Sequence, residues 1–343
     1  MNPSSWIRFR ARTGILIGCA ALVGGVPTVA SGAQYTFTFE GRGWGHGVGL
    51  SQYGARGAAL AGWDEQRILS HYYRNTAIEE QAPQRVRVLL RSTSRSVLIR
   101  GPFLARGAGT DLRVPAGRVR ASVEGRNVVL RAQDGREIAR TPGPIILRKA
   151  GGVRVRNGRY RGRVRLAASR PGVLEVVNIV GLEQYLRGVV PGEVPAAWGD
   201  DAPAAVRAQA IAARTFALAT RKKRGRFDLF SDVRSQVYRG IGIEDPRTDE
   251  AIKKTRGMVI TYGGAPIVAN FFSTSGGQTA SASTIWEGVD QPYLVSVNDP
   301  FDRVSPFHRW QEPVQISGAD LGAALGLGDS VTNLQILSTG RSP

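Results

Sequence analysis

The chain has 343 residues, one cysteine and a formal net charge of +19, from 46 Lys and Arg against 27 Asp and Glu. This length can bury an ordinary core in one to three domains, and a single cysteine excludes a fold held by intramolecular disulfides. The charge favours an anionic partner, but we find no recognition-helix, zinc-finger or aromatic RNA-binding signature and expect no nucleic acid partner.

Residues 1–33 have the layout of a secretory signal peptide. Three arginines fall within residues 8–12, an apolar run covers residues 14–26, and small residues end at Ala33. We therefore expect cleavage after Ala33 and a secreted or cell-wall protein. Lipoprotein anchoring through Cys19 is the less favoured alternative, because it leaves a very short apolar segment.

Residues 34–80 combine an alternating strand, a glycine-rich segment and a helix. The strand is expected over residues 35–39 and the helix over residues 64–73. Between them, the segment GRGWGHGVGLSQYGA surrounds His46 with glycines that let a backbone pack tightly or a ligand approach. It lacks the ending of a phosphate-binding loop. His46 could contact a ligand or could simply order the loop.

Residues 81–180 are predicted to be β-rich. Short apolar runs are separated by Gly, Pro and Asp-Gly turns, which is typical of consecutive short strands. The expected strands are residues 85–90, 96–99, 127–130, 144–147, 161–166 and 173–179. With the helices on either side, the chain is predicted to be α+β, with a β-rich N-terminal half.

Residues 181–315 are expected to form a helical and mixed core, followed by a C-terminal segment, residues 316–343, that could be incomplete. Within this core, Glu193 stands between Gly192 and Pro195, before an alanine-rich helix. A lone carboxylate on a rigid loop between two helices can act as a general acid or base, or can be a surface charge.

Six blocks of the core resemble the stage II sporulation protein D (SpoIID/LytB) family and keep its order. The blocks are residues 181–190, 192–195, 208–217, 235–240, 272–279 and 292–297. The glycine-rich segment resembles a block found near the C-terminal end of the family domain. Because it comes first here, we expect it to pack back onto the core, as in a circular permutation.

The resemblance implies a protein that acts on peptidoglycan glycan strands. Some members are lytic transglycosylases and others enhance amidases, so catalysis and modification of a cell-wall amidase both remain open, as do a sporulation role and binding of anionic wall polymers. It implies Glu193 as the catalytic residue. The substrate-binding candidates are Arg214, Gln209, Ser273, Ser275, Gln278, Tyr238, His46, Ser51, Gln52 and Tyr53.

A lytic transglycosylase needs only one carboxyl group, because the sugar's own 6-hydroxyl attacks the anomeric carbon. We expect apolar neighbours to raise the pKa of Glu193. A two-acid muramidase using Asp228 or Asp232 is a further alternative. Some family members bind zinc through Cys and His near the 235–240 block; this chain lacks them there, so we expect no metal and no cofactor.

Overall fold

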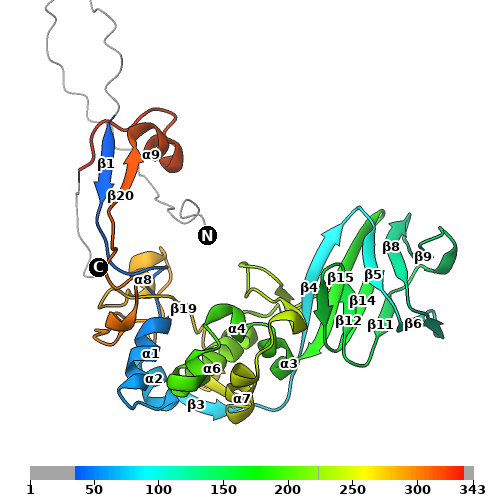
Figure 1. The fold of residues 1–343 in the computed structure, drawn as a ribbon, viewed down its shortest axis with the longest axis horizontal. Coiled ribbons are helices and arrows are strands. Elements are labelled where there is room, and N and C mark those ends of the chain that lie inside the picture. The colour runs from blue at the N-terminus through cyan, green and yellow to red at the C-terminus, as the bar shows by residue number, and fades with distance from the viewer. Residues whose placement is uncertain (1–34, 223, 336–343) are drawn as a thin grey trace, which may run out of the picture.

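The computed structural model describes residues 35–222 and 224–335. Figure 1 shows a central helical and mixed core with a β-lobe beside it along the long axis, and a narrow arm that rises from the opposite end of the core. The α+β prediction is confirmed. The predicted signal peptide, with Cys19, lies outside the described residues. No helix in the described ranges is both long and apolar enough to cross a membrane.

The β-lobe consists of two sheets that enclose one apolar core. Val97 and Ile99 of one sheet and Leu166 and Val176 of the other lie in this core, because alternate residues of a strand point to the same face. The larger sheet contains, in spatial order, β16 (Leu229–Phe230), β4 (Arg85–Thr93), β15 (Val173–Gly181), β14 (Arg163–Arg170), β11 (Ile145–Arg148), β6 (Phe103–Gly107) and β7 (Thr110–Val114). The smaller sheet contains β10 (Glu137–Thr141), β9 (Asn127–Ala132), β8 (Arg118–Glu124), β5 (Val97–Arg100), β12 (Val153–Val155) and β13 (Gly158–Tyr160).

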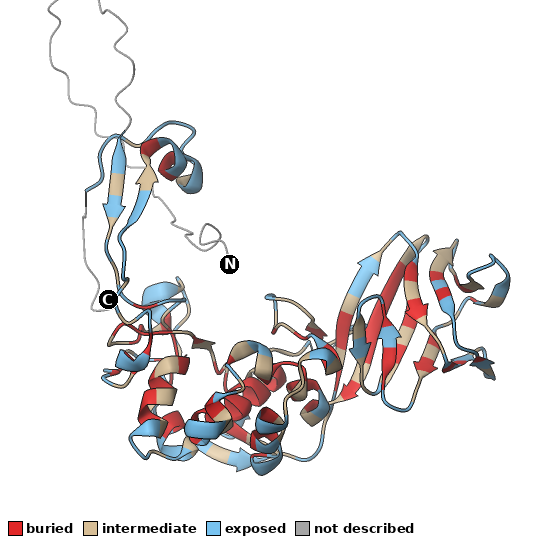
Figure 2. Cartoon of the chain, in the orientation of Figure 1, coloured by how far each residue is buried: buried red, intermediate tan, exposed pale blue. Residues whose placement is uncertain are grey.

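The central core surrounds α6 (Pro203–Thr220), which Figure 2 shows as largely buried. Its alanines face two apolar clusters, one on each side, and such a helix is buried all round because both faces are packed. The strand β15 runs directly into α3, so the β-lobe is joined to the core without a linker. The other helices of this part are α3 (Leu182–Arg187), α4 (Val190–Glu193), α5 (Trp198–Asp201), η2 (Gly240–Ile243) and α7 (Pro246–Lys254).

The N-terminal segment packs on the core through β2 (Leu50–Ser51), which pairs in parallel with β19 (Phe271–Phe272). This close packing requires glycine at position 49, because a Cβ on Gly49 would lie 2.1 Å from the Asn270 carbonyl oxygen. The helix predicted over residues 64–73 is confirmed as α2 (Glu65–Tyr72), capped by Asp64. The segment also contains α1 (Gln52–Leu60) and β3 (Ala77–Glu80), and β3 pairs with β17 (Met258–Tyr262), whose other neighbour is β18 (Ala265–Pro266).

The arm brings segments from the two ends of the described chain together. The strand β1 (Thr36–Phe39) pairs with β20 (Val314–Ser317), and α9 (Gly318–Leu325) follows. The remaining short helices, α8 (Ala282–Ile285) and η3 (Asp302–Val304), lie in the connection from the core to β20. Figure 2 shows the paired strands as mostly exposed or intermediate, so the arm adds little to either core cluster.

Candidate functional site

Glu193 ends α4, a single helical turn, rather than lying on the loop that we expected. Val194 follows in an extended conformation and donates its amide to the carbonyl of Val190 at 3.1 Å, which closes the turn. Val194 and Trp198 are both buried in one of the two core clusters. The carboxyl group is therefore anchored against packed structure on its C-terminal side.

Burial raises the pKa of Glu193 to about 7. A hydrogen bond from the backbone of Val237 and the positive charge of Arg239 oppose this effect. The residue keeps part of its surface exposed, so a ligand can reach the carboxyl group although most of its surroundings are protein. At neutral pH, about half of the molecules hold the proton, as a general acid requires.

The two groups that lower the pKa of Glu193, the Val237 backbone and the Arg239 charge, come from one extended block, residues 235–240. Its side chains alternate: Gln236 and Tyr238 are buried, whereas Val237 is partly exposed and Arg239 exposed. The inward side chains attach the block to the core, and the intervening residues are left beside Glu193. Tyr238 was the candidate chosen from this block, and Val237 and Arg239 were missed. A backbone amide such as that of Val237 has no signal in the sequence, and the charge of Arg239 acts on Glu193 only in the folded chain.

Tyr185 is a third group beside the carboxyl that sequence reasoning missed. Its hydroxyl donates to Gln236 Oε1 at 3.2 Å, and Gln236 Nε2 donates to the carbonyl of Ala213 at 3.3 Å. Burial raises the pKa of Tyr185, and the charge of Glu193 contributes to the same shift. Tyr185 is therefore a neutral hydroxyl that is held in place by a chain of hydrogen bonds.

Arg214 and Tyr238 were predicted to bind substrate, and the structure places both side chains in the interior, where contact with a substrate stays a prediction. The Arg214 side chain is 1% exposed and makes a two-bond ion pair with Glu183, at 2.9 and 2.6 Å. Tyr238 is also buried, with its hydroxyl donating to Asn178 Oδ1 at 2.8 Å. Both are positioned to hold the core together and neither faces solvent.

Gln209, Gln52 and Ser51 lie between α1 and α6 rather than in an open groove. Gln52 Nε2 donates to Gln209 Oε1 at 3.4 Å, and both residues are buried. Ser51 is fully buried and caps α1 by accepting a hydrogen bond from the amide of Gly54. The pair Gln52–Gln209 therefore joins the N-terminal segment to the core. All three residues are buried, and contact with a substrate stays a prediction for each of them.

His46 and Tyr53 remain accessible. The ring of His46 lies beside Phe272 and Trp286, at centroid distances of 5.5 and 5.3 Å, and burial lowers its pKa. The residue is nevertheless exposed, so the ring has lost only part of its contact with water. Its Nδ1 accepts a hydrogen bond from the amide of Val48 at 3.1 Å, so Nε2 carries the proton in the neutral ring.

Tyr53 connects the glycine-rich segment with the surroundings of Glu193. Its ring contacts Trp198 edge-on at 5.0 Å, and its amide donates to the carbonyl of Ser273 at 3.0 Å. Trp198 follows Glu193 by five positions. The contact places one family-like block, residues 272–279, next to the α4–α5 region through Tyr53.

The predicted polar loop is divided between internal and accessible side chains. Ser275 is buried, and its hydroxyl donates to Asp299 Oδ2 at 2.8 Å. Ser273 is partly exposed, with its hydroxyl 3.2 Å from that of Thr274, and Gln278 Nε2 donates to Ser296 Oγ at 2.9 Å. Of the three predicted residues, Ser273 and Gln278 are accessible to a ligand, and Ser275 is not.

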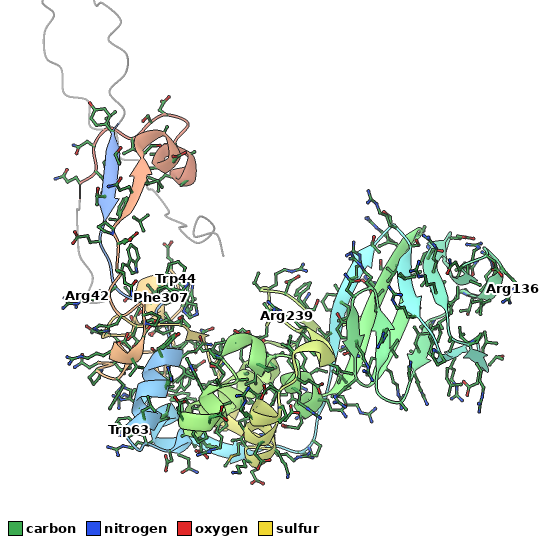
Figure 3. All side chains as sticks on the ribbon, viewed as in Figure 1. Arg42, Trp44, Trp63, Arg136, Arg239 and Phe307 are labelled. Carbon is green, nitrogen blue, oxygen red and sulfur yellow. The ribbon has the colours of Figure 1, made fainter. Side chains whose placement is uncertain are left out.

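An exposed aromatic pair stands next to this loop and was not identified from the sequence. Trp44 and Phe307 stack with ring centroids 5.3 Å apart and are 42% and 40% exposed. The amide and carbonyl of Trp44 both bond to Thr274. In Figure 3 this pair and Arg239 lie along the same upper edge of the molecule. An aromatic face that is open to solvent suits the apolar face of a sugar ring.

The two acids proposed for a two-acid mechanism, Asp228 and Asp232, form ion pairs with arginines. Asp228 accepts from Arg87 Nε at 3.0 Å and Nη2 at 2.6 Å, and also from the Arg87 amide. Asp232 pairs with Arg234 at 2.7 Å, and hydrogen bonds from Arg234 lower its pKa. Both acids are therefore ion-paired in this structure, and the two-acid alternative stays a prediction.

In the part of the chain that the structure describes, no group of three or more His, Cys, Asp or Glu side chains is arranged to hold a metal ion. The expectations of no metal and no cofactor remain predictions. Asp200 and Asp201 pair with Arg247 at 2.8 Å and Arg56 at 2.7 Å. They are engaged at the surface and do not extend the site.

Residues 171–262 match the family model of the stage II sporulation protein, SpoIID. Over 152 residues, the chain is 36% identical to stage II sporulation protein D of Bacillus subtilis (strain 168), covering 39% of this chain and 43% of that protein. It is 35% identical over 148 residues to the protein of that name from Bacillus amyloliquefaciens, covering 38% of this chain and 42% of the relative. Over 117 residues it is 34% identical to the amidase enhancer of Bacillus subtilis (strain 168), covering 34% of this chain and 15% of that protein. These matches thus span less than half of each relative.

Proposed function

We propose that the chain acts on peptidoglycan glycan strands as a lytic transglycosylase, because its residues 171–262 match the SpoIID family model. The observation that carries the proposal is the raised pKa of Glu193, about 7, in a place that a ligand can reach. We also propose that the protein is exported, that residues 1–33 are removed, and that it works in the cell wall.

The reaction is written with Glu193 as the general acid and then the general base. The carboxyl proton is transferred to the glycosidic oxygen as the bond from that oxygen to the anomeric carbon breaks. The 6-hydroxyl oxygen of the same sugar then bonds to the anomeric carbon, and its proton returns to Glu193. No water is consumed, so the atoms balance with a 1,6-anhydro end and a free hydroxyl as products.

The neighbours of Glu193 fit this cycle. Once the proton has left, the carboxylate is stabilised by the Val237 amide and the Arg239 charge, which favour the ionised form. These contacts are too weak to overcome burial, so the proton can return. The mechanism needs one carboxyl group only, so it does not depend on Asp228 or Asp232, which pair with Arg87 and Arg234.

The products test the proposal directly. Purified glycan strands digested with the protein should yield 1,6-anhydro ends by mass spectrometry. Reducing ends formed with water would instead indicate a two-acid hydrolase. Intact strands, with or without prior removal of the stem peptides, would overturn the transglycosylase proposal.

The pH dependence of the reaction follows from the same carboxyl group. Because the protonated form is the acid, kcat/KM should fall as pH rises through about 7, by about tenfold per pH unit above it. Initial rates of anhydro-product release between about pH 5 and about pH 9 measure this limb. A rate that already falls through the ordinary range of a glutamate, near pH 4.5, would contradict the role of burial.

The second candidate function is modification of a cell-wall amidase without catalysis. The match to a protein named amidase enhancer favours it. In this case the accessible surface around Glu193 would bind glycan, and the proton would be unnecessary. A purified amidase with and without this protein measures the stimulation, and the Glu193 variant described in the Discussion separates the two functions.

A further inference from the structure

The smaller sheet of the β-lobe carries four arginines in one row across four strands. Arg118 of β8 is directly opposite Arg100 of β5, Arg100 is opposite Arg154 of β12, and Arg154 is opposite Arg159 of β13. Residues in such register point to the same face, and adjacent strands lie about 4.8 Å apart. The four residues, called here the arginine row, therefore span roughly 14 Å.

The arginine row lies on the outer face of the sheet. The residues that alternate with it, such as Ile99, Val119 and Val155, are buried in the lobe core. Arg118, Arg154 and Arg159 are exposed, and Arg100 is partly exposed. The row opens onto a hollow of about 320 Å³, lined by these four arginines, Lys149, Gly101 and Gly117. No acidic and no apolar side chain lines it.

Some other arginines of the same lobe are neutralised by acidic side chains. Arg131 and Arg140 pair with Glu124 and Glu137, and Arg106 pairs with Asp111. Within the described ranges, no arginine of the row is recorded in an ion pair; Arg159 Nε instead donates to the carbonyl of Gly151 at 2.6 Å. The row is therefore a run of four adjacent arginines without an acidic partner among the described residues, in a lobe that carries further arginines outside ion pairs.

Like charges directly opposite one another destabilise a sheet. Three successive Arg–Arg pairs therefore lower the stability of the sheet, and no ion pair among the described residues requires arginine at these positions. A bound polyanion would remove the repulsion, since each guanidinium presents a planar fork that matches the oxygens of a phosphate group.

We propose that the arginine row binds an anionic polymer whose repeated charges are phosphodiesters and which carries no bases. The length of the row suits several charges in succession rather than one small anion. The absence of aromatic side chains from the hollow disfavours single-stranded nucleic acid, which is held largely by stacking of its bases. A guanidinium fork also binds carboxylates, so the test below compares the phosphodiester polymer with a carboxylate polymer.

The row begins beside the candidate catalytic site. The backbone of Arg159 lies against Gly240, where a Cβ would be 2.4 Å from the Arg159 carbonyl oxygen. Gly240 directly follows Arg239, whose charge acts on Glu193. The end of the row at Arg159 therefore lies in a strand whose backbone packs against the block that contributes Val237 to Glu193. This inference does not rest on the catalytic proposal.

The test measures binding of fluorescently labelled poly(glycerol phosphate) to the purified protein by anisotropy at several salt concentrations. The variant Arg100→Gln/Arg154→Gln removes the centre of the row. Its matched control, Arg106→Gln/Arg136→Gln, removes the same charge from exposed positions of the same lobe, and Figure 3 shows Arg136 at its far end. We expect the row variant to bind roughly tenfold or more weakly with a shallower salt dependence, and the control to bind nearly as well as the unaltered protein.

Thermal unfolding of the row variant should be unchanged or shifted upward, because the repulsion is relieved. If the row variant does not fold, Arg100→Lys/Arg154→Lys keeps the charge but loses the fork, and should still weaken binding. Equal losses in row and control variants, or full binding by the lysine variant, would overturn the proposal. So would binding of poly-glutamate or a single-stranded oligonucleotide at least as tight as that of poly(glycerol phosphate).

Discussion

Replacing Glu193 with Gln should lower the rate of anhydro-product formation by about 10²–10⁴-fold, the usual contribution of general acid–base catalysis. Gln keeps the size of the side chain and can still accept the hydrogen bond from Val237, but it has no transferable proton. Binding of glycan strands should persist. Release of anhydro products from purified strands, measured in parallel with strand binding, gives both quantities.

The same variant should be folded, and above neutral pH it should be more stable than the unaltered protein. Burial raises the pKa of Glu193 from 4.5 to about 7, so the ionised form costs stability as pH rises between these values. At about 1.4 kcal/mol per pKa unit this reaches roughly 3 kcal/mol near pH 8, and it vanishes below about pH 4. Chemical denaturation of both proteins at about pH 8 and about pH 4 measures this difference in stability. It shows whether a loss of activity in the variant comes from the missing proton or from unfolding.

The outcomes divide the candidate functions. A modifier of an amidase predicts unchanged amidase stimulation by the Gln variant. A two-acid hydrolase predicts lost activity, but the unaltered protein would then leave reducing ends. Full cleavage by the Gln variant, on strands that the unaltered protein demonstrably cleaves, would remove Glu193 from the mechanism and leave its surroundings as a binding surface.

Glu183→Gln should destabilise the fold by about 3–5 kcal/mol, because it leaves the buried Arg214 guanidinium without its counter-charge. The carbonyls of Met258 and Ile252, which also accept from Arg214, cannot replace a carboxylate. Urea unfolding measures the loss. If Arg214 instead served the glycan, the variant would keep its stability and raise KM.

An exposed pair provides the control for this measurement. Asp111→Asn removes the partner of Arg106, and both side chains of that pair are more than half exposed, at 52% and 54%. Surface pairs of this kind contribute at most about 1 kcal/mol. The difference in unfolding free energy between Glu183→Gln and Asp111→Asn then measures the effect of burial, because both changes remove one charge without changing the size of the side chain.

The helices and strands that could be predicted are those in which the spacing of apolar residues along the sequence matches the face that is buried in the fold. The helix α2 has Asp64 as its cap and Ile68, Leu69 and Tyr72 on its buried face, so the pattern needs no further context. Strands β4, β5 and β15 have clear apolar runs. Strands β6, β7, β8, β10, β12 and β13 were not predicted, because they are short or rich in arginine and depend on neighbouring strands for their hydrogen bonds.

The sequence by itself identified the family, the α+β class and Glu193 as the acid of interest, since these depend on local pattern and on the order of blocks along the chain. Only the tertiary structure decided which polar residues face a ligand. Arg214, Gln209, Tyr238 and Ser275 all belong to family-like blocks, yet each is buried with its polar group bonded to another part of the chain, and the buried Ser51 caps its own helix. The same packing brings Val237, 44 positions beyond Glu193, to the carboxyl group. Burial and contacts between distant residues set these roles, and neither is encoded in a residue's immediate neighbours.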